Sequence, residues 1–339
     1  MASPSLRRNH CTTSGSHACC DQNRITHEAR IGAYGSGAKP QPAGAGQVTD
    51  VVRLADQEYW EIADLDISNK GDTAATRRGV HITRTGSGTG TYYRIRRLDV
   101  HDVNGNQTKK DDDASAGTFF EVLGHATPTR FDDVVVENNT VRTVDHYGIH
   151  FWTRWMQRPE LNNPNCGSTC GTWTPQTPLV IRGNTVTDIG GDAIVPHHTD
   201  GALVEHNRVD GFREREPAHC AAGIWGWNTN RALYQFNEVS GGKSECDGQG
   251  LDIDEGNIGT VYQYNYSHDN EGASSSCAMA AAPPPPTTSC GTTSARTTAD
   301  SSSTSSAPRP ATPRSTTAPS ASPARSTSST TPTGRLPRT

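Results

Sequence analysis

The feature that most constrains this 339-residue chain is a short phrase that recurs along it. Each copy has an asparagine two residues before a common position, and successive copies are 45, 23, 30 and 28 residues apart. Asparagine tolerates the left-handed turn conformation, and stacked asparagine side chains can hydrogen-bond along a ladder. We therefore expect a structural role for these residues. The copies are Asn139-Thr140-Val141, Asn184-Thr185-Val186, Asn207-Arg208-Val209, Asn237-Glu238-Val239 and Asn265-Tyr266-Ser267.

Short strands follow one another around these copies. Two or three short strands per unit, with a period in the twenties, are typical of a β-solenoid. One coil cannot bury its apolar side alone, but stacked coils share a continuous core. The interval of 45 contains an insertion at Thr153–Thr177, whose Trp155 is a candidate groove wall. The expected strand regions are Tyr59–Ile67, Tyr92–Val100, Phe131–Val141, Pro178–Val186, Ala202–Val209, Ala232–Val239 and Ile258–Ser267.

In four further segments, apolar residues alternate with residues whose side chains could bind a ligand or take part in catalysis. Side chains of a strand point alternately to its two faces, so Leu251 and Ile253 would face inward and the residues between and after them outward. If the coils stack, the outward positions form one strip. The segments are Gly148-Ile149-His150-Phe151-Trp152, Ala193-Ile194-Val195-Pro196-His197, Gly223-Ile224-Trp225-Gly226-Trp227 and Gly250-Leu251-Asp252-Ile253-Asp254.

The strip would place aromatic rings beside carboxylates, which is what a sugar-binding groove requires. Aromatic rings stack on the apolar faces of pyranoses, and acids contact hydroxyls, cations or the glycosidic oxygen. We predict that Trp152, Trp225 and Trp227 bind substrate. The alternative is that Trp225 and Trp227 form an interface patch.

Asp252 and Asp254 are the main catalytic candidates. As residues i and i+2 on one strand face, their carboxyl carbons would lie about 6.5–7 Å apart. That distance lies within the window for inverting glycoside hydrolysis, about 6.5–9.5 Å, in which one acid donates a proton and the other activates water. In an elimination reaction, which needs a base to remove the proton next to a uronate carboxylate, His150 or His197 could serve as that base. Alternatively, the aspartates cap turns, and His197 and His198 form a loop pair bonded to the backbone.

A calcium ion is a further possibility for the same strip. Asp247, Asp252 and Asp254 could supply the carboxylate oxygens that Ca²⁺ prefers. The ion would neutralise a uronate carboxylate and acidify the neighbouring proton, as elimination requires. Another acidic run, Asp111-Asp112-Asp113, follows Lys109-Lys110 and is expected to be a solvated loop.

Composition excludes several classes of protein. The net charge of −5 argues against a nucleic-acid partner, and no stretch approaches the length of a membrane helix. We expect a monomer that binds a polysaccharide. Among nine cysteines, Cys220 and Cys246 would come close enough for a disulfide if their coils stack, and such a bond would indicate an oxidising compartment. Separate thiols are the alternative, as they are for Cys166 and Cys170.

The whole pattern resembles secreted bacterial right-handed parallel β-helix repeat proteins of the pectin-lyase-like superfamily. The resemblance covers about residues 31–272 and implies an all-β parallel β-helix, as well as a polysaccharide lyase or glycoside hydrolase. A glycan- or surface-binding β-helix without activity, or an inactive truncated fragment, is the alternative. The similar phrases are Tyr34-Gly35-Ser36-Gly37-Ala38-Lys39-Pro40, Asp188-Ile189-Gly190-Gly191-Asp192-Ala193-Ile194, residues 199–207, Asp247–Glu255 and residues 265–272.

The two ends of the chain differ in amino-acid composition from the repeats. Residues 1–30 contain no apolar run of the kind found in a secretion signal, so we expect a disordered or misread segment. Residues 273–339 contain no Phe, Trp, Tyr, Ile or Val and cannot form a core. They are predicted to be a disordered Ser/Thr/Pro/Ala-rich tail. A shifted reading frame is the alternative, since GC-rich codons for residues 272–277 can encode Arg-Phe-Leu-Leu-Leu-Cys in another phase.

Overall fold

A computed structural model of the chain describes residues 28–109, 113–158, 169–215 and 220–272, together with the backbone of three short strands further on. All of these residues lie within the unit Met1–Ala299. The segments 1–30 and 273–339, which the sequence predicts to be disordered or misread, lie almost wholly outside the described residues. The described part of the chain contains no helix with the length and hydropathy that a membrane span requires.

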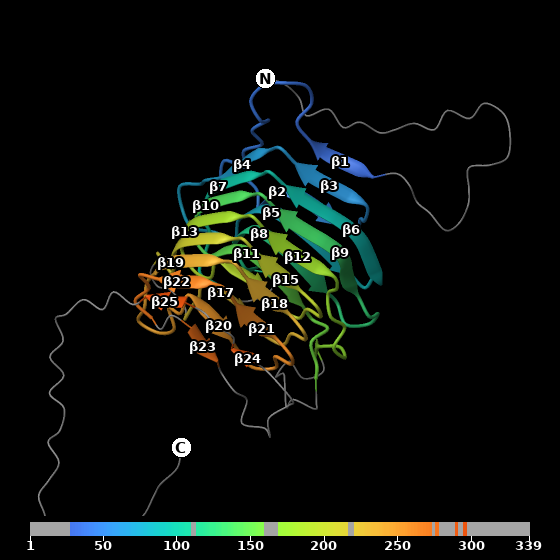
Figure 1. Ribbon diagram of the computed structural model, residues 1–339. Helices are drawn as coiled ribbons and strands as arrows, with labels where there is room; N and C mark the ends of the chain where they lie inside the picture. Colours follow the sequence, from blue (N-terminus) through green and yellow to red (C-terminus); the bar gives the residue numbers. More distant parts are fainter. Residues whose placement is uncertain are drawn as a thin grey trace, which may run out of the picture. The chain divides into compact units, whose positions relative to one another are not determined.

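The described chain is a right-handed parallel β-helix, which confirms the expected fold class (Figure 1). Three parallel sheets run along the solenoid, and each successive coil adds one strand to each sheet. Sheet A has nine strands, and sheets B and C have eight each. Because strands of successive coils pair in parallel, residues at equivalent positions of the repeat stack directly on one another.

The strand bounds follow the order of pairing within each sheet. Sheet A consists of β1 (Ala29–Gly32), β3 (Trp60–Ala63), β6 (Thr89–Arg96), β9 (Arg130–Glu137), β12 (Leu179–Arg182), β15 (Leu203–Glu205), β18 (Leu233–Gln235), β21 (Val261–Gln263) and β24 (Ser289–Cys290). Sheet B consists of β4 (Asp66–Asn69), β7 (Asp99–Val103), β10 (Thr140–Val144), β13 (Thr185–Ile189), β16 (Arg208–Phe212), β19 (Glu238–Gly242), β22 (Tyr266–His268) and β25 (Ser294–Arg296). Sheet C consists of β2 (Asp50–Ala55), β5 (Arg78–Thr85), β8 (Ala116–Leu123), β11 (Tyr147–Thr153), β14 (Ile194–Pro196), β17 (Ile224–Gly226), β20 (Leu251–Ile253) and β23 (Ser275–Cys277).

The inward faces of the three sheets form one continuous apolar core. Its aromatic members stack from coil to coil, with Phe120 and Phe151 at 4.5 Å and Tyr234 and Tyr262 at 4.1 Å between ring centroids. Leu251 and Ile253 are buried in the core, at 1% and 3% exposure, as the alternation in the sequence predicts. The strands β23, β24 and β25 continue the three sheets beyond Gly272.

The recurrent asparagines form a buried ladder through the solenoid, which confirms their structural role. Asn139 donates from Nδ2 to Oδ1 of Asn184 at 2.9 Å. The same bond links Asn184 to Asn207, Asn207 to Asn237, and Asn237 to Asn265, at 2.9, 3.0 and 2.9 Å. Each backbone N–H along the ladder also donates to the next asparagine oxygen. The ladder therefore fixes the register of five coils.

A glycine lies next to the first residue of several strands of sheet C, where the neighbouring coil comes too close for a side chain. A Cβ on Gly148 would lie 2.4 Å from the Ala193 carbonyl oxygen, and one on Gly223 would lie 2.5 Å from that of Gly250. These glycines set the spacing of successive coils where the strip on sheet C begins.

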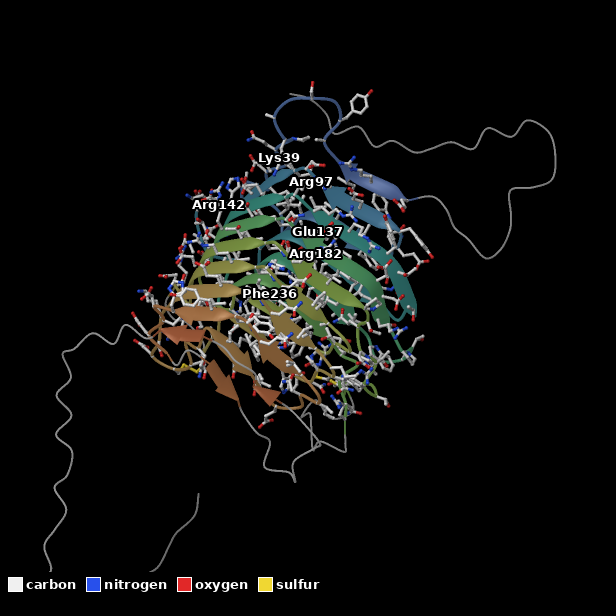
Figure 2. The ribbon with its side chains drawn as sticks, in the orientation of Figure 1. Lys39, Arg97, Glu137, Arg142, Arg182 and Phe236 are labelled. Atoms are coloured by element: carbon white, nitrogen blue, oxygen red, sulfur yellow. A yellow bond between two sulfur atoms is a disulfide. The ribbon has the colours of Figure 1, made fainter. Side chains whose placement is uncertain are left out.

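Stacking also orders the outer surface of the solenoid, where side chains of like position form rows (Figure 2). On sheet A, Glu137 pairs with Arg96 of the previous coil at 3.0 Å and with Arg182 of the next at 2.7 Å. At a corner of the coils, Phe236 has a φ of 54° and stacks between His206 and Tyr264 at 5.1 and 5.4 Å. These rows stabilise the coil stacking.

Candidate functional site

The outward side chains of sheet C form the strip that the sequence predicts. Strand β11 pairs with β14 so that His150 lies beside Val195, and β17 pairs with β20 so that Trp225 lies beside Asp252. At the other end of the strip, Trp152 lies beside Glu121 of β8. The coil stacking thus brings the predicted aromatic, histidine and carboxylate residues onto one face, in the predicted order.

The aromatic part of the strip is a tight cluster of rings. Trp152 and Trp227 stack at 6.1 Å with an interplanar angle of 16°. His197 meets the Trp225 ring edge to face at 4.5 Å, and it lies 6.0 Å from both Trp152 and Trp227. All three tryptophans are partly exposed. They offer ring surface that a sugar can contact.

His150 and His197 are buried within this cluster, at 3% exposure each. His150 stacks on Tyr147 at 3.9 Å and on Phe119 at 4.9 Å, and Nδ1 of His197 accepts the backbone N–H of Trp227 at 3.0 Å. Burial lowers the pKa of both imidazoles well below the usual value, and neighbouring histidines lower it further. Both imidazoles are therefore held in the neutral form, and His197 bonds to backbone, as the alternative interpretation expects. A role as a base stays a prediction for both.

Carboxylates lie at the C-terminal end of the strip. Asp252 and Asp254 are partly exposed, and Asp247, which precedes β20 in the same coil, is exposed. Burial raises the pKa of Asp254, and the negative charges of Glu255 and Asp247 raise it further, while Lys109 opposes them. The charge of Asp247 thus acts on the ionisation of Asp254.

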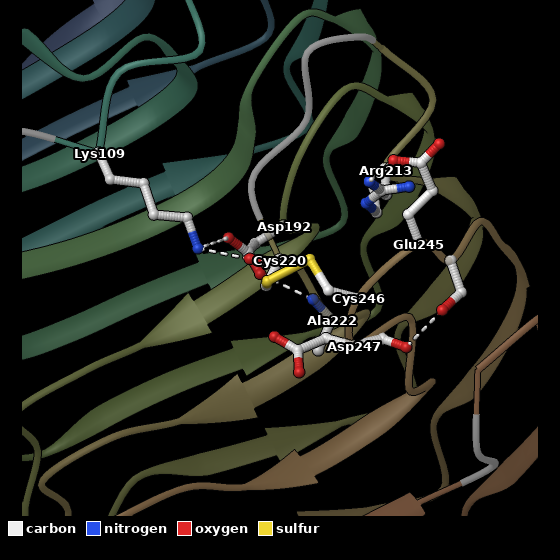
Figure 3. Close-up of a disulfide and its surroundings, with 9 residues drawn as sticks. Lys109, Asp192, Arg213, Cys220, Ala222, Glu245, Cys246 and Asp247 are labelled. Carbon is white, nitrogen blue, oxygen red and sulfur yellow. Dashed lines mark hydrogen bonds and ion pairs between the residues drawn. A yellow bond between two sulfur atoms is a disulfide. The ribbon is translucent and has the colours of Figure 1, made fainter. Parts of the chain in front are cut away.

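A further carboxylate, Asp192, lies near the Cys220–Cys246 disulfide and is fully buried (Figure 3). Its Oδ1 accepts the backbone N–H of Ala222 and the indole Nε1–H of Trp225, both at 2.8 Å. Its Oδ2 lies 3.8 Å from the ammonium of Lys109. Burial raises the pKa of Asp192, Lys109 lowers it, and Asp247 raises it. Asp247 thus raises the pKa of both Asp192 and Asp254, and we call these three carboxyl groups the acidic cluster.

The turn that follows β20 and carries Asp254 is held by one contact within the turn and by two from other parts of the chain. The Asp254 carbonyl accepts Nδ2 of Asn257 at 2.6 Å, and the Glu255 carbonyl accepts the N–H of Asn228 at 3.0 Å. Arg158, which is 2% exposed, donates to the Gly256 carbonyl at 3.1 Å. The insertion that contains Arg158 therefore supports the carboxylate-bearing turn.

Trp155 of the same insertion is not a groove wall, because it is 5% exposed and packs into the main core. Its segment turns inward, where Thr174 donates its N–H to the Trp155 carbonyl at 3.0 Å. The prediction for this residue is wrong because sequence alone does not show on which side an inserted loop packs.

The predicted calcium site has no support in the described part of the chain. There, no three His, Cys, Asp or Glu side chains come together in a group that could hold a metal ion. Asp247, Asp252 and Asp254 are at the predicted places in the coil, yet they do not form such a group. The calcium ion stays a prediction.

Cys220 and Cys246 form a disulfide with a Cα–Cα distance of 5.0 Å (Figure 3). The bond joins two consecutive coils beside the acidic cluster, since Cys246 precedes Asp247 directly. Cys170 is also disulfide-bonded, and Cys166 lies outside the described residues.

Sequence reasoning did not identify Asp192, Lys109 or Arg158 as residues of this site. Asp192 lies in a phrase that the sequence analysis used only as a sign of the fold. Lys109 is not a purely solvated residue, since its side chain is 37% exposed and its ammonium donates to the Cys220 carbonyl at 2.5 Å. Lys109 and Cys220 are 111 residues apart in the sequence, so no local sequence pattern could have revealed their contact.

The similar proteins found by comparison with known sequences and structures are lacto-N-biosidases. No family model matches the sequence. A lacto-N-biosidase from Bifidobacterium longum subsp. longum is 28% identical over 287 residues, which cover 68% of this chain and 18% of that protein. Crystal structures of the GH136 lacto-N-biosidase from Eubacterium ramulus, native and selenomethionine derivative, give a TM-score of 0.63 at 28% identity. The superposed part covers 74% of this chain and 48% of the Eubacterium ramulus chain. The chain thus spans less than half the length of these similar proteins.

Proposed function

We propose that this chain is the β-helix part of a glycoside hydrolase whose groove follows the outward face of sheet C. The observation that carries the proposal is the acidic cluster at one end of a row of partly exposed tryptophans. Rings of this kind hold a pyranose by its apolar face, and coupled carboxylates supply acid and base. The similarity to two lacto-N-biosidases supports the same reaction class.

Asp254 and Asp247 are the pair that we assign to the chemistry. Burial and the negative charge of Asp247 both raise the pKa of Asp254, which favours the protonated form of that carboxyl group. Glycoside hydrolysis needs that form, because one carboxyl group must donate a proton to the leaving oxygen while the other, ionised, acts on the sugar. Asp252, one position before the core residue Ile253, adds negative charge to the same surface.

The stereochemical course follows from which pair reacts. Asp252 with Asp254, at about 6.5–7 Å, would leave room for a water molecule and give inversion. A closer pair would attack the sugar directly and give retention. Proton NMR of the first-formed sugar distinguishes the two courses.

Hydrolysis is favoured over elimination by the charge of the site. A lyase must bind a uronate carboxylate, which the acidic cluster would repel unless a cation intervened. Absorbance near 235 nm, where an unsaturated uronide absorbs, would reveal an elimination product, and we expect none.

The test begins with an aryl lacto-N-bioside, because the similar proteins carry that activity in their names. We expect the wild type to release the aryl group and Asp254→Asn to lose at least about 10²-fold in kcat, as loss of a catalytic acid or base does. Asp254, whose pKa is raised, is the expected acid, so the loss in Asp254→Asn should be smaller with a good leaving group than with a poor one. An Asp254→Asn variant as active as wild type on a substrate with a poor leaving group contradicts the proposal.

A glycan-binding β-helix without activity is the second candidate, favoured by the row of tryptophans. It predicts that retention on an immobilised glycan falls in Trp225→Ala while no product forms with any substrate. We further propose that the protein is secreted and monomeric, since the Cys220–Cys246 disulfide suits an oxidising compartment.

A further inference from the structure

Lys109 is a cation in the middle of an acidic site, although it comes from a remote part of the chain. It lies between β7 and β8, and its ammonium reaches across the face of sheet C to the Cys220 carbonyl, at 2.5 Å (Figure 3). The base of its loop is anchored, because Asn106 donates from Nδ2 to Thr76 at 3.0 Å and from its N–H to Ser115 at 3.1 Å. The loop therefore presents Lys109 in a defined place.

The ammonium compensates a buried negative charge. Asp192 is fully buried, and no residue that the structure describes hydrogen-bonds to its Oδ2, so the Lys109 ammonium at 3.8 Å is its counter-charge there. A buried carboxylate is held in its ionised form only where a positive group or hydrogen bonds compensate it. Without Lys109, Asp192 would take up a proton or change its position.

The position of Asp192 decides the position of Trp225. Oδ1 of Asp192 accepts both the Trp225 indole N–H and the Ala222 N–H, so one carboxylate holds a ring of the strip and the backbone three residues before it. Trp225 lies beside Asp252 in the sheet. A change at Lys109 is thus transmitted through Asp192 to the ring that borders the carboxylates.

We propose that Lys109 is a positioning residue of the glycoside-hydrolase site, which orients Trp225 through Asp192 and offsets the charge of the acidic cluster. The inference rests on the proposed function for its effect on activity, but the orientation of Trp225 is independent of it. The Cys220–Cys246 disulfide supports the same arrangement, since it fixes the carbonyl that Lys109 binds.

The experiment compares Lys109→Met with Lys109→Arg in the full chain. Lys70→Met is the matched control, because the Lys70 side chain is 73% exposed and its ion pair with Asp102, at 4.0 Å, lies on the surface. We expect Lys109→Met to lower kcat about 10- to 100-fold, as a small displacement of a positioned group does, with a smaller change in KM. Lys109→Arg keeps the charge and should recover part of the loss.

Near-ultraviolet circular dichroism gives a readout that does not need activity. Lys109→Met and Asp192→Asn should change the tryptophan signal in the same way, and the change should vanish in a Trp225→Phe background. If Lys109→Met matches Lys70→Met in both readouts, or loses activity with an unchanged Trp225 signal, the inference is overturned. If the wild type has no activity, the proposed function fails and the Trp225 signal alone decides the inference.

Discussion

The asparagine ladder can be tested at its central member, Asn207, which is 1% exposed. Its Nδ2 donates to the Ile181 carbonyl and to Asn237 Oδ1, both at 3.0 Å. Its Oδ1 accepts the N–H and the Nδ2 of Asn184, at 3.1 and 2.9 Å. Asn207→Ala removes all four bonds and provides no replacement within the buried corner.

The expected cost follows from that count. A buried hydrogen bond contributes about 1 kcal/mol net, so four bonds amount to about 4 kcal/mol, and a buried N–H left without an acceptor adds to this. We therefore expect Asn207→Ala to lower the free energy of unfolding by about 3–5 kcal/mol. Asn184 keeps its bond to the Val136 carbonyl at 3.0 Å, which limits the damage to one level of the ladder.

Urea unfolding followed by far-ultraviolet circular dichroism measures this cost. The control is Asn138→Ala, which changes an exposed asparagine outside the ladder that has a φ of 56°. Its cost should be about 1–2 kcal/mol, because alanine is strained in the left-handed region. If Asn207→Ala costs no more than Asn138→Ala, the ladder does not stabilise the stack and the reasoning is refuted.

Two further predictions concern stability beside the proposed site. Because its pKa is raised by burial first, and then by Glu255 and Asp247, Asp254 binds its proton more tightly in the folded protein than in the unfolded chain. That contribution to stability is full below the unfolded pKa of about 3.9 and is lost as pH rises through the folded pKa. Asp254→Asn should therefore be more stable than wild type at pH 7, with a free energy of unfolding higher by about 1.4 kcal/mol for each unit of pKa shift and a correspondingly higher melting temperature. The gain should disappear near pH 3. Equal melting temperatures at pH 7 contradict this prediction. Replacing Cys220 and Cys246 by alanine should lower stability by about 3–4 kcal/mol for a loop of 26 residues, and unchanged melting of the double variant would contradict it.

The sequence predicts the coil repeat well because the repeat is a local property. The asparagine recurs in every copy, and the alternation around Leu251 and Ile253 states which face of a strand is apolar. Parallel stacking then repeats the same contact in each coil, so the inward and outward positions of one coil predict those of the next. The order of residues along the strip follows from the same periodicity.

What covers the strip was decided only by the tertiary structure. His150 and His197 were expected to face a groove, but aromatic neighbours from other coils bury them and keep them neutral. Lys109 reaches Cys220 across 111 residues, and Arg158 reaches Gly256 across 98. Such contacts depend on how loops of different coils fold over the sheet. A periodic pattern contains no information on them, whereas it fully specifies which side chains face outward.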